Sequence, residues 1–232
     1  MKTVLITGGV RGIGKSTALA FLKKGYRVCV TYSRDEASAK EIVALGVETY
    51  QAKAENENAA RALFEKIGAV DVLVNNAGIS LIKQIQDVTA EEFDRVFAVN
   101  VRGAFLYARE AAKGMIARKS GLIVNVSSVW GEVGGSCESV YSASKAALIG
   151  FSKALAKELG WSGIRVNSIS PGVIDTKMNA HFSQEERNGL VEEIPMGRLG
   201  KGDDVAKAVL FLEENEYITG VDIPVNGGFS IV

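Results

Sequence analysis

The feature that most constrains the fold of this chain is a regular alternation of short apolar runs with longer amphipathic stretches. The apolar runs have the character of buried strands and lie at residues 3–7, 27–31, 47–51, 70–74, 121–126, 164–169 and 222–225. The amphipathic stretches have helical spacing; the first runs through residue 22, and the others lie at residues 36–45, 57–67, 91–117, 140–159 and 203–211. This alternation predicts an α/β fold. We expect one doubly wound Rossmann domain over residues 1–232, with a mostly parallel seven-stranded sheet and helices on both faces.

The balance of charge and apolar residues restricts the partners of the chain. The 27 Lys and Arg residues equal the 27 Asp and Glu residues, so no net charge favours nucleic acid or an anionic membrane surface. No apolar run reaches the roughly 18 residues of a membrane span, and no signal-peptide pattern opens the sequence, so we expect a cytoplasmic protein. His181 is the only histidine, and Cys29 and Cys137 lie far apart in the sequence, which argues against a metal site and a disulfide.

A glycine-rich turn joins the first strand to the first helix. Glycines in this context let the backbone approach a pyrophosphate over the N-terminus of the helix, although a tight turn without a ligand is the alternative. The residues expected to hold a dinucleotide here are Gly8, Arg11, Gly12, Ile13 and Gly14.

The end of the second strand indicates which dinucleotide is bound. An acid at this place would bind the ribose 2′-hydroxyl of NAD, but the sequence has Ser33 and Arg34, and the first acid is Asp35. Arg34 and Arg11 could receive a 2′-phosphate through charge-assisted hydrogen bonds, which favours NADP(H). The alternative is that both arginines are solvated loop residues.

Small residues follow the fourth strand. Asn76, Ala77 and Gly78 would let a flat adenine or ribose pack on the backbone, and an asparagine side chain can brace a neighbouring turn. We therefore expect these three residues to contribute to the cofactor site, although the pattern is also a common loop ending.

Three polar side chains gather around the fifth strand and the helix that follows it. Ser128 comes just after the strand, and Tyr141 and Lys145 are four residues apart, which places both on one face of a helix. A free tyrosine has a pKa of about 10, and a nearby ammonium lowers this pKa. The cluster therefore predicts a proton-transfer site. Taken singly, each residue could instead be a turn former or a solvated surface residue.

With these segments the chain resembles the classical short-chain dehydrogenase/reductase family over nearly its whole length. The likeness rests on residues 7–14 (TGGVRGIG), 75–78 (NNAG), Asn100, Ser128, 141–145 (YSASK), 171–172 (PG) and 225–228 (VNGG). Within the family the chain is most similar to the β-ketoacyl-acyl carrier protein reductases, through residues 165–167 (RVN), 194–200 (IPMGRLG) and 218–220 (ITG).

The resemblance implies an enzyme that reduces a 3-oxoacyl-[acyl-carrier-protein] to its 3-hydroxyacyl form with NADPH in fatty acid biosynthesis. Ser128 would donate a hydrogen bond to the carbonyl oxygen, and Tyr141 would supply the proton. Lys145 would lower the pKa of Tyr141 and hold the nicotinamide ribose, and Asn100 would brace a water that leads to Lys145. Hydride transfer itself belongs to the cofactor.

The resemblance also implies contacts away from these four residues. Pro171, Gly172, Ile174 and Thr176 would border the nicotinamide, and the polar segment at about 174–196 has the character of a mobile substrate lid. The acyl carrier protein could bind through Arg118 and Lys119. A homotetramer is expected, in which the long helices starting near residues 91 and 140 pack against their copies.

Two departures from the family pattern keep other functions open. Lys53 stands where the family usually has an aspartate that contacts the adenine, and Ser162 stands where the ketoacyl reductases tend to carry a basic residue. The alternatives are a reductase or dehydrogenase of a small free carbonyl or alcohol, such as a sugar, steroid or quinone, and a non-catalytic dinucleotide-binding protein.

Overall fold

The computed structural model describes residues 1–179 and 183–231. His181 and the middle of the expected lid lie outside the described residues. Among the described helices, none is long and apolar enough to cross a membrane.

The described strands form one sheet, in the order β3-β2-β1-β4-β5-β6-β7. Every pairing between neighbours is parallel. The strands are β1 (Thr3–Ile6), β2 (Arg27–Tyr32), β3 (Glu48–Gln51), β4 (Val72–Asn75), β5 (Gly121–Val126), β6 (Ile164–Pro171) and β7 (Asp222–Val225). The strand order reverses direction between β1 and β4, which is the point where doubly wound sheets bind ligands at the carboxyl ends of their strands. The predicted fold class is confirmed.

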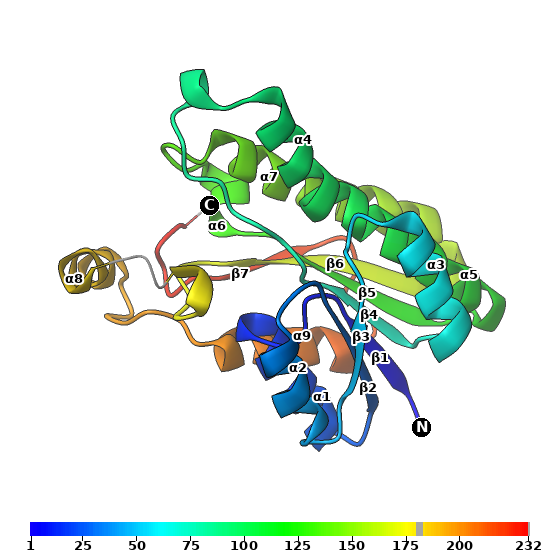
Figure 1. The fold of residues 1–232 in the computed structure, drawn as a ribbon. Helices are drawn as coiled ribbons and strands as arrows, with labels where there is room; N and C mark the ends of the chain where they lie inside the picture. Colours follow the sequence, from blue (N-terminus) through cyan, green and yellow to red (C-terminus); the bar gives the residue numbers. More distant parts are fainter. Residues whose placement is uncertain (180–182, 232) are drawn as a thin grey trace.

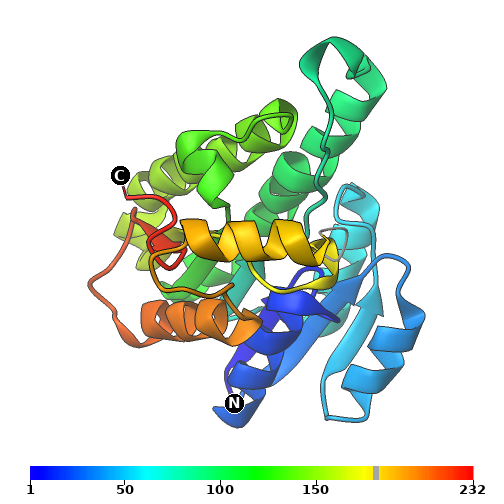
Figure 2. The ribbon, with the colours of Figure 1, turned by 90° about the vertical axis from the view of Figure 1, so that its left-hand side faces the viewer.

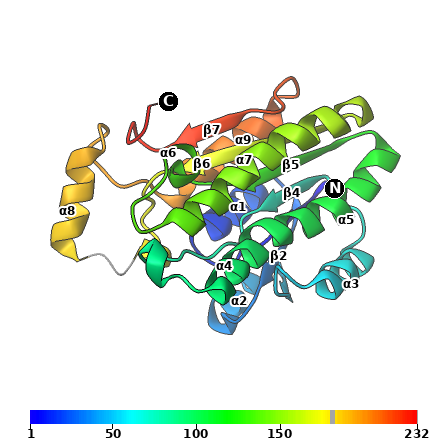
Figure 3. The ribbon, with the colours of Figure 1, turned by 90° about the horizontal axis from the view of Figure 1, so that it is seen from above.

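Helices cover both faces of the sheet, as Figures 1 and 3 show. One face carries α1 (Gly12–Lys23), α2 (Glu36–Val43) and α9 (Gly202–Glu214). The other carries α3 (Glu57–Ile67), α5 (Gly103–Arg118) and α7 (Ser139–Leu159), extended by the shorter α4 (Ala90–Phe97) and α6 (Val129–Val133). Because both faces are covered, the inner strands are buried on both sides, which explains the apolar runs of the sequence, whereas the edge strands β3 and β7 are only partly buried.

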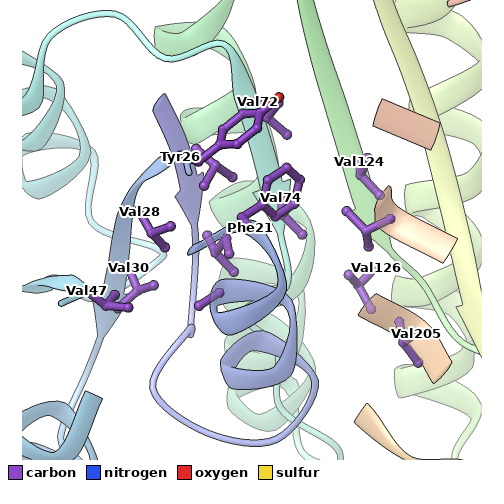
Figure 4. Packing of buried hydrophobic residues seen from close by; sticks show 14 of the residues in the cluster. Phe21, Tyr26, Val28, Val30, Val47, Val72, Val74, Val124, Val126 and Val205 are labelled. Atoms are coloured by element: carbon purple, nitrogen blue, oxygen red, sulfur yellow. The ribbon is translucent and has the colours of Figure 1, made fainter. Parts of the chain in front are cut away.

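Alternate side chains of the inner strands enter two separate cores. In β1, Val4 and Ile6 pack with Phe21 of α1, whereas Leu5 points to the opposite core. Figure 4 shows Phe21 and the neighbouring Tyr26 among the strand valines; the two aromatic rings meet edge to face with centroids 4.9 Å apart. Burial on both sides therefore fixes the register of the strands that carry the site.

Two elements differ from the expectation. The single helix expected at residues 91–117 is interrupted by a π-helical turn, η2 (Ala98–Arg102), between α4 and α5. The segment expected to be a lid contains a helix, α8 (Gln184–Glu193), that begins with a capping box between Ser183 and Glu186. None of the residues of α8 is buried, so it lacks the apolar spacing that reveals a helix. Figure 2, turned toward the side on which α8 lies, shows this helix across the front of the molecule.

Candidate active site

A cavity of about 510 Å³ lies at the carboxyl ends of the strands. Its volume is within the range of small-molecule sites, about 300–1,000 Å³. The structure brings most of the predicted site residues to its wall, namely Gly8, Arg11, Gly12, Ile13, Ser33, Arg34, Asn76, Ala77, Gly78, Ser128, Tyr141, Lys145, Pro171, Gly172, Ile174 and Thr176. Gly14 and Asn100 do not line the cavity and lie behind it.

The turn before α1 requires its glycines. Gly8 and Gly12 adopt φ values of +64° and +53°, in the left-handed region that favours glycine. A Cβ on Gly14 would lie only 2.6 Å from the carbonyl oxygen of Gly8. The Asn76 side-chain amide donates to the carbonyl oxygens of Thr7, at 2.9 Å, and Gly8, at 3.1 Å, and so braces the turn.

The same turn presents a helix end that suits an anion. No side chain caps the start of α1, and its first turn contains no acidic residue. The first N–H groups of a helix carry a partial positive charge, and here they are at the wall of the cavity. The turn therefore fits the pyrophosphate of a dinucleotide.

A cationic corner lies beside this turn, at the end of β2. Arg11, Arg34 and Lys177 all border the cavity there. The first acid after β2, Asp35, caps α2 by accepting from the Ser38 N–H at 3.1 Å, and it also lies 3.6 Å from Arg11 Nη1. The hydrogen bonds from Ser38, with the charges of Lys177 and Arg11, lower the pKa of Asp35. The acid is thus engaged in capping, and the corner fits a phosphate group.

The elements after β5 place Ser128, Tyr141 and Lys145 on one wall. Ser128 caps α6, its Oγ accepting from the Trp130 N–H at 3.2 Å. A Cβ on Gly131 would lie 2.8 Å from the backbone of Lys145, so α6 packs directly on α7. Lys145 Nζ donates to the Val126 carbonyl at 2.8 Å and lies 5.7 Å from the ring centroid of Tyr141.

Burial controls the ionisation of this cluster. Tyr141 is 9% exposed and Lys145 is 4% exposed. Burial raises the pKa of Tyr141 to about 12, while a hydrogen bond with Ser128 acts in the opposite direction. Burial lowers the pKa of Lys145 to about 8. Both shifts have the same origin, because loss of solvent disfavours the charged form of each group. The effect of Lys145 on the pKa of Tyr141 stays a prediction.

Asn100 connects three elements behind the cavity. Its Oδ1 accepts from the Ile79 N–H at 2.9 Å, and its Nδ2 donates to the Ile79 carbonyl and to Ser144 Oγ, both at 3.0 Å. A Cβ on Gly78 would come within 3.4 Å of both Asn100 Oδ1 and Lys145 Nζ, so these two polar groups converge there. The π-helical turn gives Asn100 this position, and π-turns often occur at functional sites. Its role in holding a water stays a prediction.

The sequence interpretation missed two serines whose hydroxyls bind the backbone of α7. Ser127 Oγ donates to the Lys145 carbonyl at 2.8 Å, and Ser144 Oγ donates to the Tyr141 carbonyl at 2.7 Å. Both hydroxyls are buried. The only signal in the sequence was that each serine is adjacent to a residue of the predicted cluster.

Two predictions concern residues at the periphery. Leu190 of α8 borders the cavity, so part of the expected lid segment is at the cavity wall, and its role as a lid stays a prediction. Arg118, by contrast, lies at the end of α5, and its Nη2 donates to the Val70 carbonyl before β4 at 2.8 Å. It and Lys119 are at the amino ends of the strands, about 20 Å from the carboxyl ends at the usual rise of a strand. They do not border the cavity of the same chain.

No metal site accompanies the cavity within residues 1–179 and 183–231, where no group of three or more His, Cys, Asp or Glu side chains is arranged to hold an ion.

Comparisons with known proteins agree with this geometry. A family model described as enoyl-(acyl carrier protein) reductase matches residues 8–230. The 3-oxoacyl-[acyl-carrier-protein] reductase FabG of Staphylococcus aureus is 38% identical over 98% of this chain and 97% of its own. The FabG of Thermotoga maritima is 38% identical over 99% and 98%, and the uncharacterized oxidoreductase YmfI of Bacillus subtilis is 39% identical over 98% of both chains.

Solved structures are similar over the same length. ElxO with NADP bound is 35% identical, with a TM-score of 0.89 and coverage of 98% of both chains. A tyrosine-to-phenylalanine variant of ElxO with NADPH bound is 34% identical, with the same TM-score and coverage.

Proposed function

The chain belongs to the short-chain dehydrogenase/reductase family, and on this premise we propose that it reduces the keto group of a 3-oxoacyl thioester with NADPH. The observation that carries the proposal is that Ser128, Tyr141 and Lys145 share the wall of one cavity with the glycine turn and the cationic corner. Relatives named as 3-oxoacyl-[acyl-carrier-protein] reductases, similar over nearly their full length, support the thioester.

The residues at the wall fit NADPH, and solved relatives that hold NADP or NADPH support this cofactor. Bound NADPH would supply the hydride. The glycine turn would hold the pyrophosphate, and Arg11, Ser33 and Arg34 would hold the 2′-phosphate. Residues 76–78 would border the adenosine, and Pro171, Gly172, Ile174 and Thr176 would border the nicotinamide.

Ser128 and Tyr141 would act on the oxygen of the substrate carbonyl. As the carbonyl carbon gains hydride, the oxygen gains negative charge, which a hydrogen bond from Ser128 stabilises. Tyr141 then gives its phenolic proton to that oxygen, so that the keto group becomes an alcohol. A pKa of about 12 keeps the phenol protonated at neutral pH until that charge develops.

Lys145 would stabilise the phenolate that this transfer leaves. Its pKa of about 8 leaves the ammonium charged at pH 7, and the Val126 carbonyl fixes its position below the ring. Asn100 would support the return of a proton to Tyr141, since its Oδ1 and Lys145 Nζ converge near Gly78.

A second candidate substrate is a small free carbonyl compound, such as a sugar, steroid or quinone. Ser162 in place of a basic residue favours it, as does the distance of Arg118 and Lys119 from the cavity of the same chain. If an acyl carrier protein binds these two residues, we propose that it serves the site of another copy in a homotetramer. Phe93 and Phe105, each 43% exposed on α4 and α5, offer apolar surface for such packing, and a monomer in light scattering would refute it.

The test is NADPH oxidation with a panel of acetoacetyl thioesters and free carbonyl compounds, for the wild type and Tyr141→Phe. We expect turnover of the thioesters, and loss of turnover in Tyr141→Phe with NADPH binding retained. Turnover of free carbonyl compounds alone would favour the second candidate. NADPH binding without turnover of any carbonyl would indicate a non-catalytic dinucleotide-binding protein and refute both.

A further inference from the structure

Two carboxylates that the proposed chemistry does not use meet between α6 and β7. They belong to Glu132, on the turn that follows Ser128, and to Asp222, at the start of β7. Glu132 Oε2 and Asp222 Oδ1 are both buried, and no hydrogen-bond donor of the described residues reaches either atom. Such orphaned oxygens are costly in a protein interior, so the pair needs an explanation.

A shared proton would satisfy both oxygens. The other oxygen of Asp222, Oδ2, already accepts from Ser170 Oγ at 2.7 Å, which leaves Oδ1 for Glu132. Two carboxylates at hydrogen-bond distance hold one proton between them because two adjacent anions repel. Burial, followed by the hydrogen bond and charge of Asp222, raises the pKa of Glu132 to about 7.

The elements around the pair contribute no compensating cation. On β6 the facing groups are the hydroxyls of Ser168 and Ser170, and Ser168 is in register with Asp222. On α7 the nearby cation, Lys145, directs its Nζ to the Val126 carbonyl. In the part of the chain that the structure describes, Asp222 is the one charged group that shifts the pKa of Glu132.

The contact between Glu132 and Asp222 connects α6 to β7. The helix α6 is short and has little stability of its own. A helix of one turn depends on tertiary contacts for its position. For α6 these contacts include Glu132 with Asp222 and the Trp130 ring against Phe229, with centroids 5.5 Å apart. Because Ser128 caps α6, a displacement of α6 moves the Ser128 hydroxyl.

We propose that Glu132 and Asp222 share one proton, and that this proton holds α6 on β7 and thereby positions Ser128. Loss of the proton leaves two buried anions, which repel and release α6 from β7. Glu132 and Asp222 are positioning residues that act through Ser128. The part of this proposal that concerns activity rests on the proposed function, whereas the movement of α6 does not.

The first test needs no substrate. Trp130 lies on α6, and the only other tryptophan, Trp161, is 99% exposed and can be removed as Trp161→Phe. In that background we expect the Trp130 fluorescence to change in a transition near pH 7. The transition should vanish in Glu132→Gln and in Asp222→Asn, because an amide donates its hydrogen bond at any pH. Glu158→Gln, an exposed site on α7, is the matched control and should keep the transition.

The second test uses the ratio of kcat of Glu132→Gln to kcat of the wild type between pH 5.5 and 9. Misplacing one oxyanion donor costs at most about 10²–10³ in kcat, so we expect this ratio to rise by about tenfold across pH 7. The KM for NADPH should stay constant, and the ratio for Glu158→Gln should stay flat. A wild type without the fluorescence transition, or a transition that survives in both amide variants, would overturn the proposal. If the transition is present but no carbonyl substrate is found, the proposed function fails and the shared proton stands.

Discussion

Replacing Lys145 by methionine should make the protein more stable while abolishing its activity. Lys145 is 4% exposed, and the described hydrogen bond of its ammonium goes to a neutral carbonyl, that of Val126. Burial lowers its pKa from 10.5 to about 8. At about 1.4 kcal/mol per pKa unit, holding the charged form inside the folded chain costs about 3 kcal/mol at pH 7.

Methionine has a similar length and carries no charge, so Lys145→Met removes this cost. The Val126 carbonyl loses its hydrogen bond, which offsets about 1 kcal/mol. We expect the free energy of unfolding at pH 7 to rise by about 2 kcal/mol, or the Tm by about 4–8 °C for a chain of this length. Catalysis should be lost because the phenolate of Tyr141 would have no cation beside it.

The pH dependence of this stability gain follows from the direction of the Lys145 pKa shift. The folded pKa lies below the unfolded one, so between about pH 8 and 10.5 the unfolded chain binds more protons, and the wild type gains stability as the pH rises. The advantage of Lys145→Met should therefore be full below pH 8 and shrink above it.

The assay is thermal and urea unfolding at equal protein concentration, from pH 7 to 10.5. Lys153→Met, two turns further along α7 and exposed, is the matched control and should change stability little. Two results would show that burial does not disfavour the charged form of Lys145. One is a Lys145→Met protein no more stable than the wild type at pH 7, and the other is a gain in stability that does not change with pH.

Three further predictions concern the cofactor site and the core. Arg34→Leu should weaken NADPH binding by about tenfold to a hundredfold, the loss of one charge-assisted hydrogen bond, and leave NADH binding unchanged in a fluorescence titration; an equal loss for both cofactors would contradict the role of Arg34. Gly14→Ala should abolish NADPH binding measured by calorimetry, because the added Cβ would lie 2.6 Å from the Gly8 carbonyl oxygen. Normal binding would show that the backbone of the turn can move to make room for the Cβ. Phe21→Ala should lower the free energy of unfolding by about 3–5 kcal/mol without changing the KM for NADPH. If urea titration gives a decrease of less than about 1 kcal/mol, the neighbouring side chains repack into the cavity.

The sheet could be predicted because its inner strands are buried on both faces, so that most strands are short apolar runs between helices. The interruption at Asn100 could not, because the apolar spacing of residues 91–117 continues through it. Inside the π-helical turn, Asn100 donates hydrogen bonds to Ile79 and Ser144, which are distant in sequence. For α8 a readable signal did exist, since Ser183 and Glu186 have the spacing of a capping box.

For the site, the sequence indicated which side chains converge but not how they are solvated. The spacing of Tyr141 and Lys145 predicted a shared face, and both side chains border the cavity. The pKa of Tyr141 is raised by burial, and the burial of this side chain depends on tertiary packing that no local pattern reveals. The pairing of Glu132 with Asp222 joins positions 90 residues apart, and only the folded chain makes it visible.

The π-helical turn also places an extra residue between two helices. A π-turn contains about one residue more than an α-helical turn, and each residue of an α-helix adds about 100° of rotation. Because the π-turn completes its rotation with this extra residue, deleting one residue within Ala98–Arg102 would restore a regular helix and leave α4 and α5 nearly in phase, whereas a deletion within a regular helix would rotate α4 by about 100°. The stacked rings of Phe93 and Phe97 would keep their place, but Asn100, inside the turn, would shift away from Ile79. The extra residue of this segment therefore shapes the active site without altering the outer surface, and removing it would be a local change.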